Sequence, residues 1–127
     1  MKLGRIFKLT AASLLLLGFY APTVFADKSG VSIEAPAEVA PGTKITIKLD
    51  VTHHGNSFIH HTDWVYLKVN GKEVKRWKYG WNSLPGSENF TVTFEYTVNN
   101  PIKIEAEAHC NIHGSKGPAT VMVNVKK

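Results

Sequence analysis

The chain has 127 residues, one cysteine and a formal net charge of +5. Its length suits a single domain, and one cysteine cannot form an intramolecular disulfide, which excludes a disulfide-stapled fold. Without the first 26 residues, three of the 15 Lys and Arg and none of the 10 Asp and Glu are lost, so the charge becomes 12 − 10 = +2. The basic character therefore lies mostly in the N-terminal segment, and we predict no nucleic-acid partner.

The N-terminal segment has the pattern of a cleavable signal peptide. Three basic residues precede an apolar stretch at residues 9–20, and Val24 and Ala26 fit the small-residue cleavage pattern. The apolar stretch is too short for a comfortable membrane span. We therefore predict a signal peptide over residues 1–26 and a mature domain over residues 27–127. The mature protein is expected to be periplasmic or secreted, with no attachment to the membrane after cleavage.

The rest of the chain alternates apolar and polar residues, which is typical of half-buried strands. The alternating runs lie at residues 31–33, 45–51, 65–69, 73–79, 90–98, 102–110 and 121–125. Asn70-Gly71 is a strong hairpin-turn signal between the third and fourth runs. About seven strands without a helix predict an all-β fold, an immunoglobulin-like antiparallel β-sandwich. No Cys…Trp…Cys pattern is present, which disfavours a true immunoglobulin domain.

Two segments carry side chains that bind transition metals. The run HHGNSFIHHTDW at residues 53–64 holds four histidines, and the run AHCNIHG at residues 108–114 holds the single cysteine. In the second run Cys110 and His113 are separated by two residues. Imidazoles together with a thiolate form a transition-metal ligand set, although a free cysteine can also serve as a small buried hydrophobe. Strand alternation places Cys110 on the inward face of its strand and turns His109 outward.

Together the two segments resemble the superoxide reductases, the family of the neelaredoxins and desulfoferrodoxins. His54 is followed six positions later by His60, and Trp64 lies four positions beyond, which is the family's spacing. The family's Cys-Asn-x-His-Gly signature stands at residues 110–114. The stretch at residues 31–51 is also similar to the first two strands of the family.

The resemblance implies one mononuclear non-haem iron that cycles between Fe2+ and Fe3+. His54, His60 and His113 match the equatorial ligands, and Cys110 matches the axial ligand. The implied reaction reduces superoxide to hydrogen peroxide, with electrons from an external donor such as a rubredoxin-like carrier. The family also implies a homo-oligomer.

The N-terminal loop departs from the family pattern. The family's Glu-Lys-His tripeptide falls on Asp27, Lys28 and Ser29, so the lysine is kept and the histidine is lost. The resemblance implies that Lys28 favours superoxide near the open metal position. Three explanations for the missing ligand stay open: His53 or His61 takes its place, the site works with three histidines and a water, or the chain binds metal without efficient catalysis.

The remaining histidines are expected to lie outside the ligand set. His53 and His109 should be turned away by strand alternation, and His61 should support the ligands or lie at the surface. We therefore take neither His53 nor His109 as a predicted ligand.

Two other functions are compatible with parts of the pattern. A cupredoxin-like copper electron carrier would also be an exported sandwich with an upstream histidine and a Cys-x-x-His loop. Such carriers normally place a methionine soon after that histidine, whereas residues 114–119 contain none and Met122 lies within a strand. The other alternative is a non-catalytic metal-binding or interaction β-sandwich, which the missing histidine keeps open.

Overall fold

The computed structural model describes residues 27–127, and the predicted signal peptide lies outside them. The strands are β1 (Gly30–Glu34), β2 (Glu38–Val39), β3 (Thr43–Thr52), β4 (Thr62–Val69), β5 (Lys72–Lys78), β6 (Phe90–Val98), β7 (Ile102–Cys110) and β8 (Ala119–Val125). In this part of the chain no helix is long and apolar enough to span a membrane.

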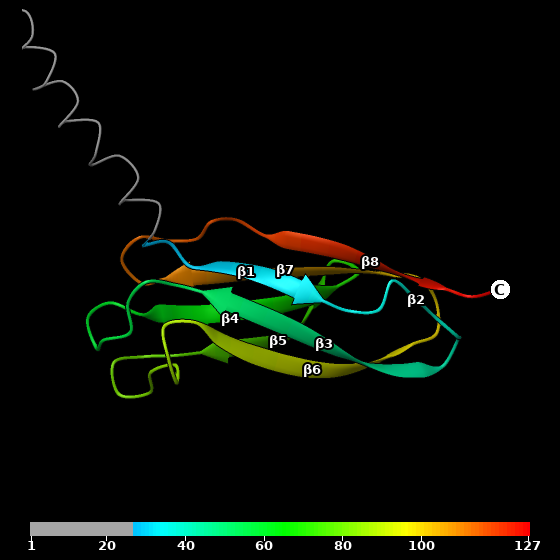
Figure 1. Cartoon of the computed structure of the whole chain (residues 1–127), viewed down its shortest axis with the longest axis horizontal. Helices are drawn as coiled ribbons and strands as arrows, with labels where there is room; N and C mark the ends of the chain where they lie inside the picture. The colour runs from blue at the N-terminus through cyan, green and yellow to red at the C-terminus, as the bar shows by residue number, and fades with distance from the viewer. Residues whose placement is uncertain (1–26) are drawn as a thin grey trace, which may run out of the picture.

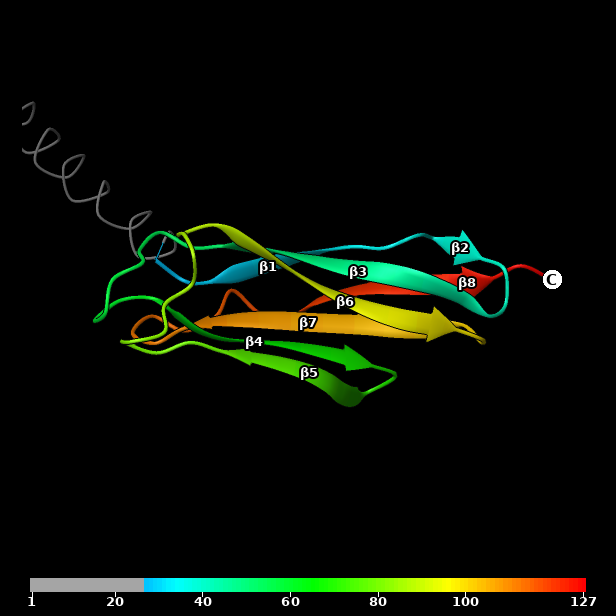
Figure 2. The same cartoon turned by 90° about the horizontal axis from the view of Figure 1, so that it is seen from below.

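The strands form two sheets that pack face to face (Figures 1 and 2). One sheet has the order β1-β3-β6 and the other the order β2-β8-β7-β4-β5. All pairs are antiparallel except that of β2 with β8. The predicted immunoglobulin-like sandwich is therefore confirmed. Seven of the eight strands were predicted. The one that was not is β2, which has only two residues, too few to show an alternating pattern.

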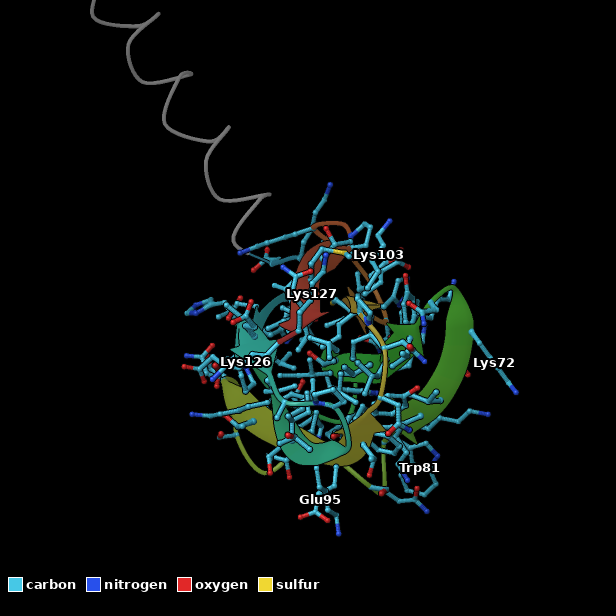
Figure 3. The ribbon with its side chains drawn as sticks, turned by 90° about the vertical axis from the view of Figure 1, so that its right-hand side faces the viewer. Lys72, Trp81, Glu95, Lys103, Lys126 and Lys127 are labelled. Atoms are coloured by element: carbon cyan, nitrogen blue, oxygen red, sulfur yellow. The ribbon has the colours of Figure 1, made fainter. Side chains whose placement is uncertain are left out.

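The core forms because the apolar residues of each strand all point toward the opposite sheet. In β3 and β7 every second residue is buried, as expected for a period of two. Figure 3, which looks along the sandwich, shows side chains filling the space between the sheets. The largest fully buried side chains in the core include Ile47, Leu49, Leu67, Ile104, Val51, Val65, Val98 and Val123. Burial of this apolar surface is the main force that holds the two sheets together.

The hairpin between β4 and β5 follows the prediction. Asn70 and Gly71 both have positive φ, at 51° and 82°. This is the conformation of the type I′ turn that connects two twisted antiparallel strands.

A β-bulge lies at the start of β4, beside the functional end of the molecule. Thr62 is opposite Cys110 in β7 and Trp64 is opposite His109, so Asp63 is the extra residue. The bulge changes the alternation of β4, and Thr62 is buried on the inner side together with Cys110. Bulges are common next to active sites, where they redirect side chains.

Three loops gather at the end of the sandwich that lies away from the C-terminus (Figure 1). They connect β3 with β4, β5 with β6, and β7 with β8. Asn56 ties the first loop to the second by donating to the Pro85 carbonyl at 2.9 Å. Asn111 ties the third loop to the first by donating to the Ile59 carbonyl at 3.1 Å. The two metal-ligand segments of the sequence are thereby brought together.

Candidate metal centre

Cys110 is the last residue of β7 and is fully buried. The chain turns sharply after it, because Cys110 N donates to Gly114 O at 2.8 Å and Gly114 N donates to Cys110 O at 3.0 Å. The backbone N–H of His113, inside this turn, donates to the Cys110 sulfur at 3.4 Å. The thiolate is the form in which cysteine binds metals. The turn therefore holds the sulfur in place and directs a backbone donor toward it.

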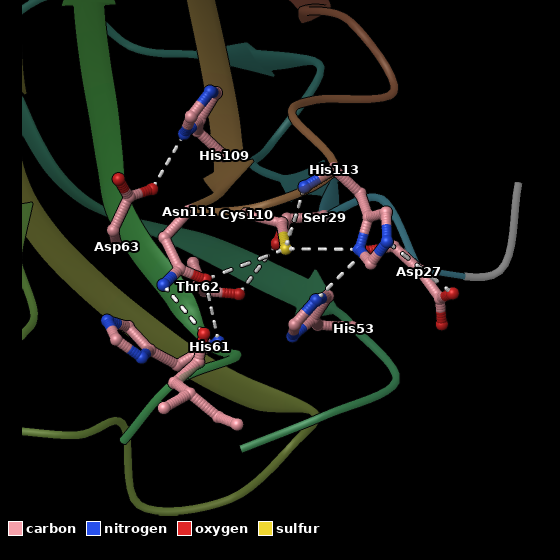
Figure 4. Close-up of polar contacts among 11 residues, drawn as sticks. Asp27, Ser29, His53, His61, Thr62, Asp63, His109, Cys110, Asn111 and His113 are labelled. Atoms are coloured by element: carbon pink, nitrogen blue, oxygen red, sulfur yellow. Dashed lines mark hydrogen bonds and ion pairs between the residues drawn. The ribbon is translucent and has the colours of Figure 1, made fainter. Parts of the chain in front are cut away.

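Two histidines from distant segments, His60 and His113, meet beside this sulfur, and Figure 4 shows His113 next to Cys110. Nδ1 of His113 lies 3.9 Å from the Cys110 sulfur and 3.1 Å from Nε2 of His60. The rings of His60 and His113 are nearly perpendicular, with centroids 4.9 Å apart. His60 comes from the β3–β4 loop and His113 from the β7–β8 loop, so the contact joins both predicted ligand segments.

His53 completes the cluster. The ligand atoms of His53, His60 and Cys110 all lie within 4.8 Å of one another. Imidazole nitrogens and a thiolate suit iron as well as other transition metals. The donor set therefore fits a single iron ion, with His113 adjacent to two of its three members.

Both ring nitrogens of His53 face backbone carbonyls. Its Nδ1 lies 2.7 Å from the Gly55 carbonyl and its Nε2 lies 3.0 Å from the Asp27 carbonyl. Burial lowers the pKa of His53, which favours the neutral imidazole that binds metals. A neutral ring has one N–H, so only one carbonyl can be satisfied and the other nitrogen presents a lone pair to an acceptor. A metal can bind that nitrogen only when the facing carbonyl moves away from it.

The structure places the predicted ligand His54 outside the cluster. Its side chain is 78% exposed, and its Nδ1 lies 3.5 Å from a carboxylate oxygen of Glu88. His53 is 5% exposed and lies in the cluster, so the expectation that His53 turns away is wrong. The reason is strand alternation itself, because the inward positions of β3 end at Val51 and the next one is His53. The family's spacing of six residues before His60 had led to the prediction of His54 as the ligand.

His61 holds the loops together instead of joining the cluster. It is buried, and its Nδ1 lies 2.9 Å from the Ser57 carbonyl. Its backbone N–H donates to Oδ1 of Asn111 at 3.0 Å, and Asn111 N donates to the His61 carbonyl at 3.1 Å. Asn111 is thus the residue that fixes the two ligand loops relative to each other.

The N-terminal segment lies against the same end of the sandwich. Ser29, at the position of the missing histidine, is fully buried, and its hydroxyl lies 2.7 Å from the hydroxyl of Thr62. Its backbone N–H donates to the Gly114 carbonyl at 3.2 Å. A carboxylate oxygen of Asp27 lies 4.0 Å from Nε2 of His113. Lys28, which lies between Asp27 and Ser29 in the chain, is half-buried.

His109 points away from the cluster, as strand alternation predicts. Its Nδ1 lies 2.7 Å from the Asp63 carboxylate, and its ring stacks on Trp64 with a centroid distance of 4.8 Å. Figure 4 shows His109 and Asp63 apart from Cys110 and His113. Trp64 therefore belongs to the outer face of the larger sheet.

Gly55 is a site residue that the sequence pattern did not single out. Its φ is +145°, and a Cβ built at this position would lie 2.5 Å from Nδ1 of His60. Only glycine allows the His60 ring to lie so close to the loop backbone. The sequence signal that could have identified Gly55 is its position between the pairs His53-His54 and His60-His61.

We expect Gly55→Ala to displace His60 and to lower metal affinity by about 10- to 100-fold, the effect of losing a residue that orients a ligand. Gly71→Ala is the matched control, because Gly71 also has positive φ but a Cβ added there would have no other atom within 4 Å. Metal titration of both variants measures the difference. Equal affinities would show that Gly55 does not hold His60 in place.

Known proteins resemble this chain in sequence and in fold. A family model described as Desulfoferrodoxin matches residues 24–116. The superoxide reductase (neelaredoxin) from Ignicoccus hospitalis is 24% identical, with coverage of 78% of this chain and 82% of that chain and a TM-score of 0.64. The superoxide reductase (neelaredoxin) from Archaeoglobus fulgidus, in the reduced form, is 21% identical, with coverages of 76% and 89% and a TM-score of 0.52.

A PKD domain of an M14-like peptidase from a Thermoplasmatales archaeon has a TM-score of 0.57 at 15% identity, with coverages of 80% and 99%. At these identities the structural likeness shows a shared sandwich fold. No curated protein matches the chain significantly. The family match spans well over half of the chain and includes His53, His60, Cys110 and His113. This chain therefore belongs to the desulfoferrodoxin family, the family of the superoxide reductases.

Proposed function

We propose that the protein is an exported superoxide reductase with one mononuclear non-haem iron. The observation that carries the proposal is the convergence of His53, His60 and Cys110 within 4.8 Å at one end of the sandwich. His113 is the fourth protein ligand in this proposal, because it contacts both His60 and the Cys110 sulfur.

When bound, ferrous iron supplies the electron that reduces superoxide. The substrate takes up one electron and two protons and leaves as hydrogen peroxide. Cys110 would contribute the only anionic side chain of the ligand set, and its thiolate would donate electron density to the iron. The histidines are neutral ligands, so the site keeps the positive charge that attracts an anion.

Two parts of this proposal, the external electron donor and the export of the protein, rest on the sequence. The chain has one cysteine, so it has no four-cysteine iron module of its own, and an external one-electron carrier has to restore the ferrous state. The basic and apolar N-terminal pattern ending at Ala26 supports export to the periplasm or the medium.

The test of this function measures metal content and superoxide removal in the same preparation. The protein is purified anaerobically and its iron and copper are quantified. We expect about one iron per chain and, in pulse radiolysis, removal of superoxide much faster than by free ferrous iron. A copper-loaded protein that is redox-active without consuming superoxide would identify an electron carrier. A rate no faster than that of free iron would identify a non-catalytic binding protein.

Lys28 is proposed to attract superoxide to the site, since it lies between Asp27 and Ser29 at the cluster end. Lys28→Ala should slow superoxide capture by about two- to tenfold at low salt and weaken its dependence on ionic strength. The control is Lys72→Ala, in the β4–β5 hairpin, which lies at the other end of these two strands from the gathered loops (Figure 2). If both variants keep the wild-type rate at every salt concentration, Lys28 has no part in the reaction.

A further inference from the structure

The outer face of the larger sheet carries a row of stacked rings that ends next to Cys110. The His109 ring lies parallel to Trp64, with an interplanar angle of 4° and a centroid distance of 4.8 Å. Trp64 in turn stacks on Tyr66 at 5.7 Å. We call these three side chains the outer stack. Because His109 precedes Cys110 in β7, a single peptide bond joins the outer stack to the residue whose sulfur lies in the metal cluster.

The outer stack is fixed in place and still reaches the surface. The Asp63 carboxylate lies 2.7 Å from Nδ1 of His109. The Arg76 guanidinium, from β5, lies over the Trp64 ring, 5.0 Å from its centroid, in a cation–π contact. The His109 side chain is 33% exposed. A protein that binds this face would therefore touch rings that lead inward to Cys110.

β5, the edge strand beside the outer stack, has a surplus of positive charge. Its sequence KEVKRWK has four basic residues against one acidic residue, a net charge of +3. The acidic residue, Glu73, pairs with Arg76 at 2.7 Å. Lys75 and Lys78 are exposed, and neither forms an ion pair with any residue that the structure describes. Lys78 lies directly opposite Trp64 in the sheet, so this charge adjoins the outer stack.

The carboxylates of β7 on the same face already have partners. Glu105 pairs with Lys68 at 3.8 Å. Glu107 accepts a hydrogen bond from the Tyr66 hydroxyl at 3.0 Å. The charges that remain available to a partner on the β5 side are therefore lysines, and they favour an acidic partner.

We propose that the outer stack, together with Lys75 and Lys78, is the surface on which an acidic one-electron carrier protein docks and delivers its electron. The electron enters at the outer stack and reaches the iron through His109 and the Cys110 thiolate. One electron leaves the carrier and the ferric ion becomes ferrous, with no bond made or broken. The inference rests on the proposed function, because that function needs an external electron donor.

Docking on the outer face keeps the carrier away from the loop end of the sandwich. The β3–β4 and β7–β8 loops carry His60 and His113, so a carrier seated over these loops would stand in the way of superoxide. On the outer face the carrier approaches through β7 instead, and both reactants have access at the same time. Complexes between redox proteins are usually small and short-lived, and lysines near the contact raise the rate at which an acidic carrier arrives.

Docking is tested first without any redox reaction. An oxidised rubredoxin of net negative charge is titrated into the zinc-loaded protein, since zinc binds the same types of ligand, and NMR records the shifts. We expect shifts at β5 amides and at the Trp64 indole. At low salt the dissociation constant should rise about tenfold or more for Lys78→Glu.

The matched control is Lys126→Glu, which makes the same charge change after β8, on the other side of the molecule from β5 (Figure 3). Its dissociation constant should stay within about twofold of wild type, because the site lies beyond the range of unscreened charge. Shifts confined to the three gathered loops, or no binding at all, would overturn the proposal.

The electron route is tested by stopped-flow reduction of the ferric protein at saturating reduced rubredoxin, followed through loss of the thiolate-to-iron absorption. We expect Trp64→Leu to slow this reduction several-fold and Trp64→Phe, which keeps a ring in the outer stack, to restore most of the rate. The absorption maximum of the ferric form should be the same in both variants, which shows that the centre itself is unchanged. Equal rates for Trp64→Leu and wild type would remove the outer stack from the route. The proposed function is checked separately, by reaction of pre-reduced wild-type protein with superoxide, so either idea can fail without the other.

Discussion

Cys110→Ser is expected to abolish the thiolate-to-iron charge-transfer absorption of the iron-loaded protein and to lower its iron affinity by at least about 100-fold. Changes in residues that merely orient ligands cost up to this much, so loss of a ligand should cost no less. The Cys110 sulfur is held by a rigid turn, with the His113 N–H donating to it. A serine hydroxyl stays protonated near neutral pH and cannot replace the thiolate.

The substitution also has a control in the metal-free state. Serine is close to cysteine in size, so the buried position keeps its packing and the free energy of unfolding without metal should change by about 1–3 kcal/mol. Urea unfolding of the metal-free proteins measures this change. An unchanged visible spectrum in a folded, iron-loaded Cys110→Ser variant would refute the assignment of Cys110 as a ligand.

The second large effect separates two adjacent histidines. His53→Ala should lower metal affinity by at least about 100-fold, because its ring lies in the cluster. His54→Ala should leave the affinity within about twofold, because its ring is exposed and pairs with Glu88 at the surface, and such surface pairs contribute little. Metal titration of the two variants under identical conditions gives the comparison directly.

The opposite result would be equally informative. If His54→Ala lost the metal and His53→Ala kept it, the family spacing of six residues to His60 would identify the ligand. The loop at residues 53–55 would then bind metal in a different conformation from the one described. Metal-free unfolding of both variants serves as the control, since the buried His53 also contacts the Asp27 and Gly55 carbonyls.

In the described part of the chain, three histidines lie in or beside the cluster. His53 enters the cluster, but His54 leaves it, so the cluster still has three histidines with His60 and His113. Ser29 is held by Thr62 and by the backbone of Gly114. His61 is held by the Ser57 carbonyl. This arrangement favours a site with three histidines and an open position over one in which His61 supplies the fourth.

The sequence by itself determined seven of the eight strands and the inward face of Cys110. The alternation of apolar residues is a local property, and it predicted β6 and β7 with their observed ends. The same alternation, extended from Val51, would also have placed His53 inside the site. His54 was predicted as a ligand because motif spacing was given more weight than strand alternation.

Only the tertiary structure decided which side chains meet. The contact of His60 with His113 joins segments 53 residues apart, and their approach depends on how β3, β4 and β7 pair. The bulge at Asp63 turns Thr62 inward against the local alternation, and Gly55 is needed only because the His60 ring lies against it. These features arise from contacts between distant segments, and no local pattern of residues encodes them.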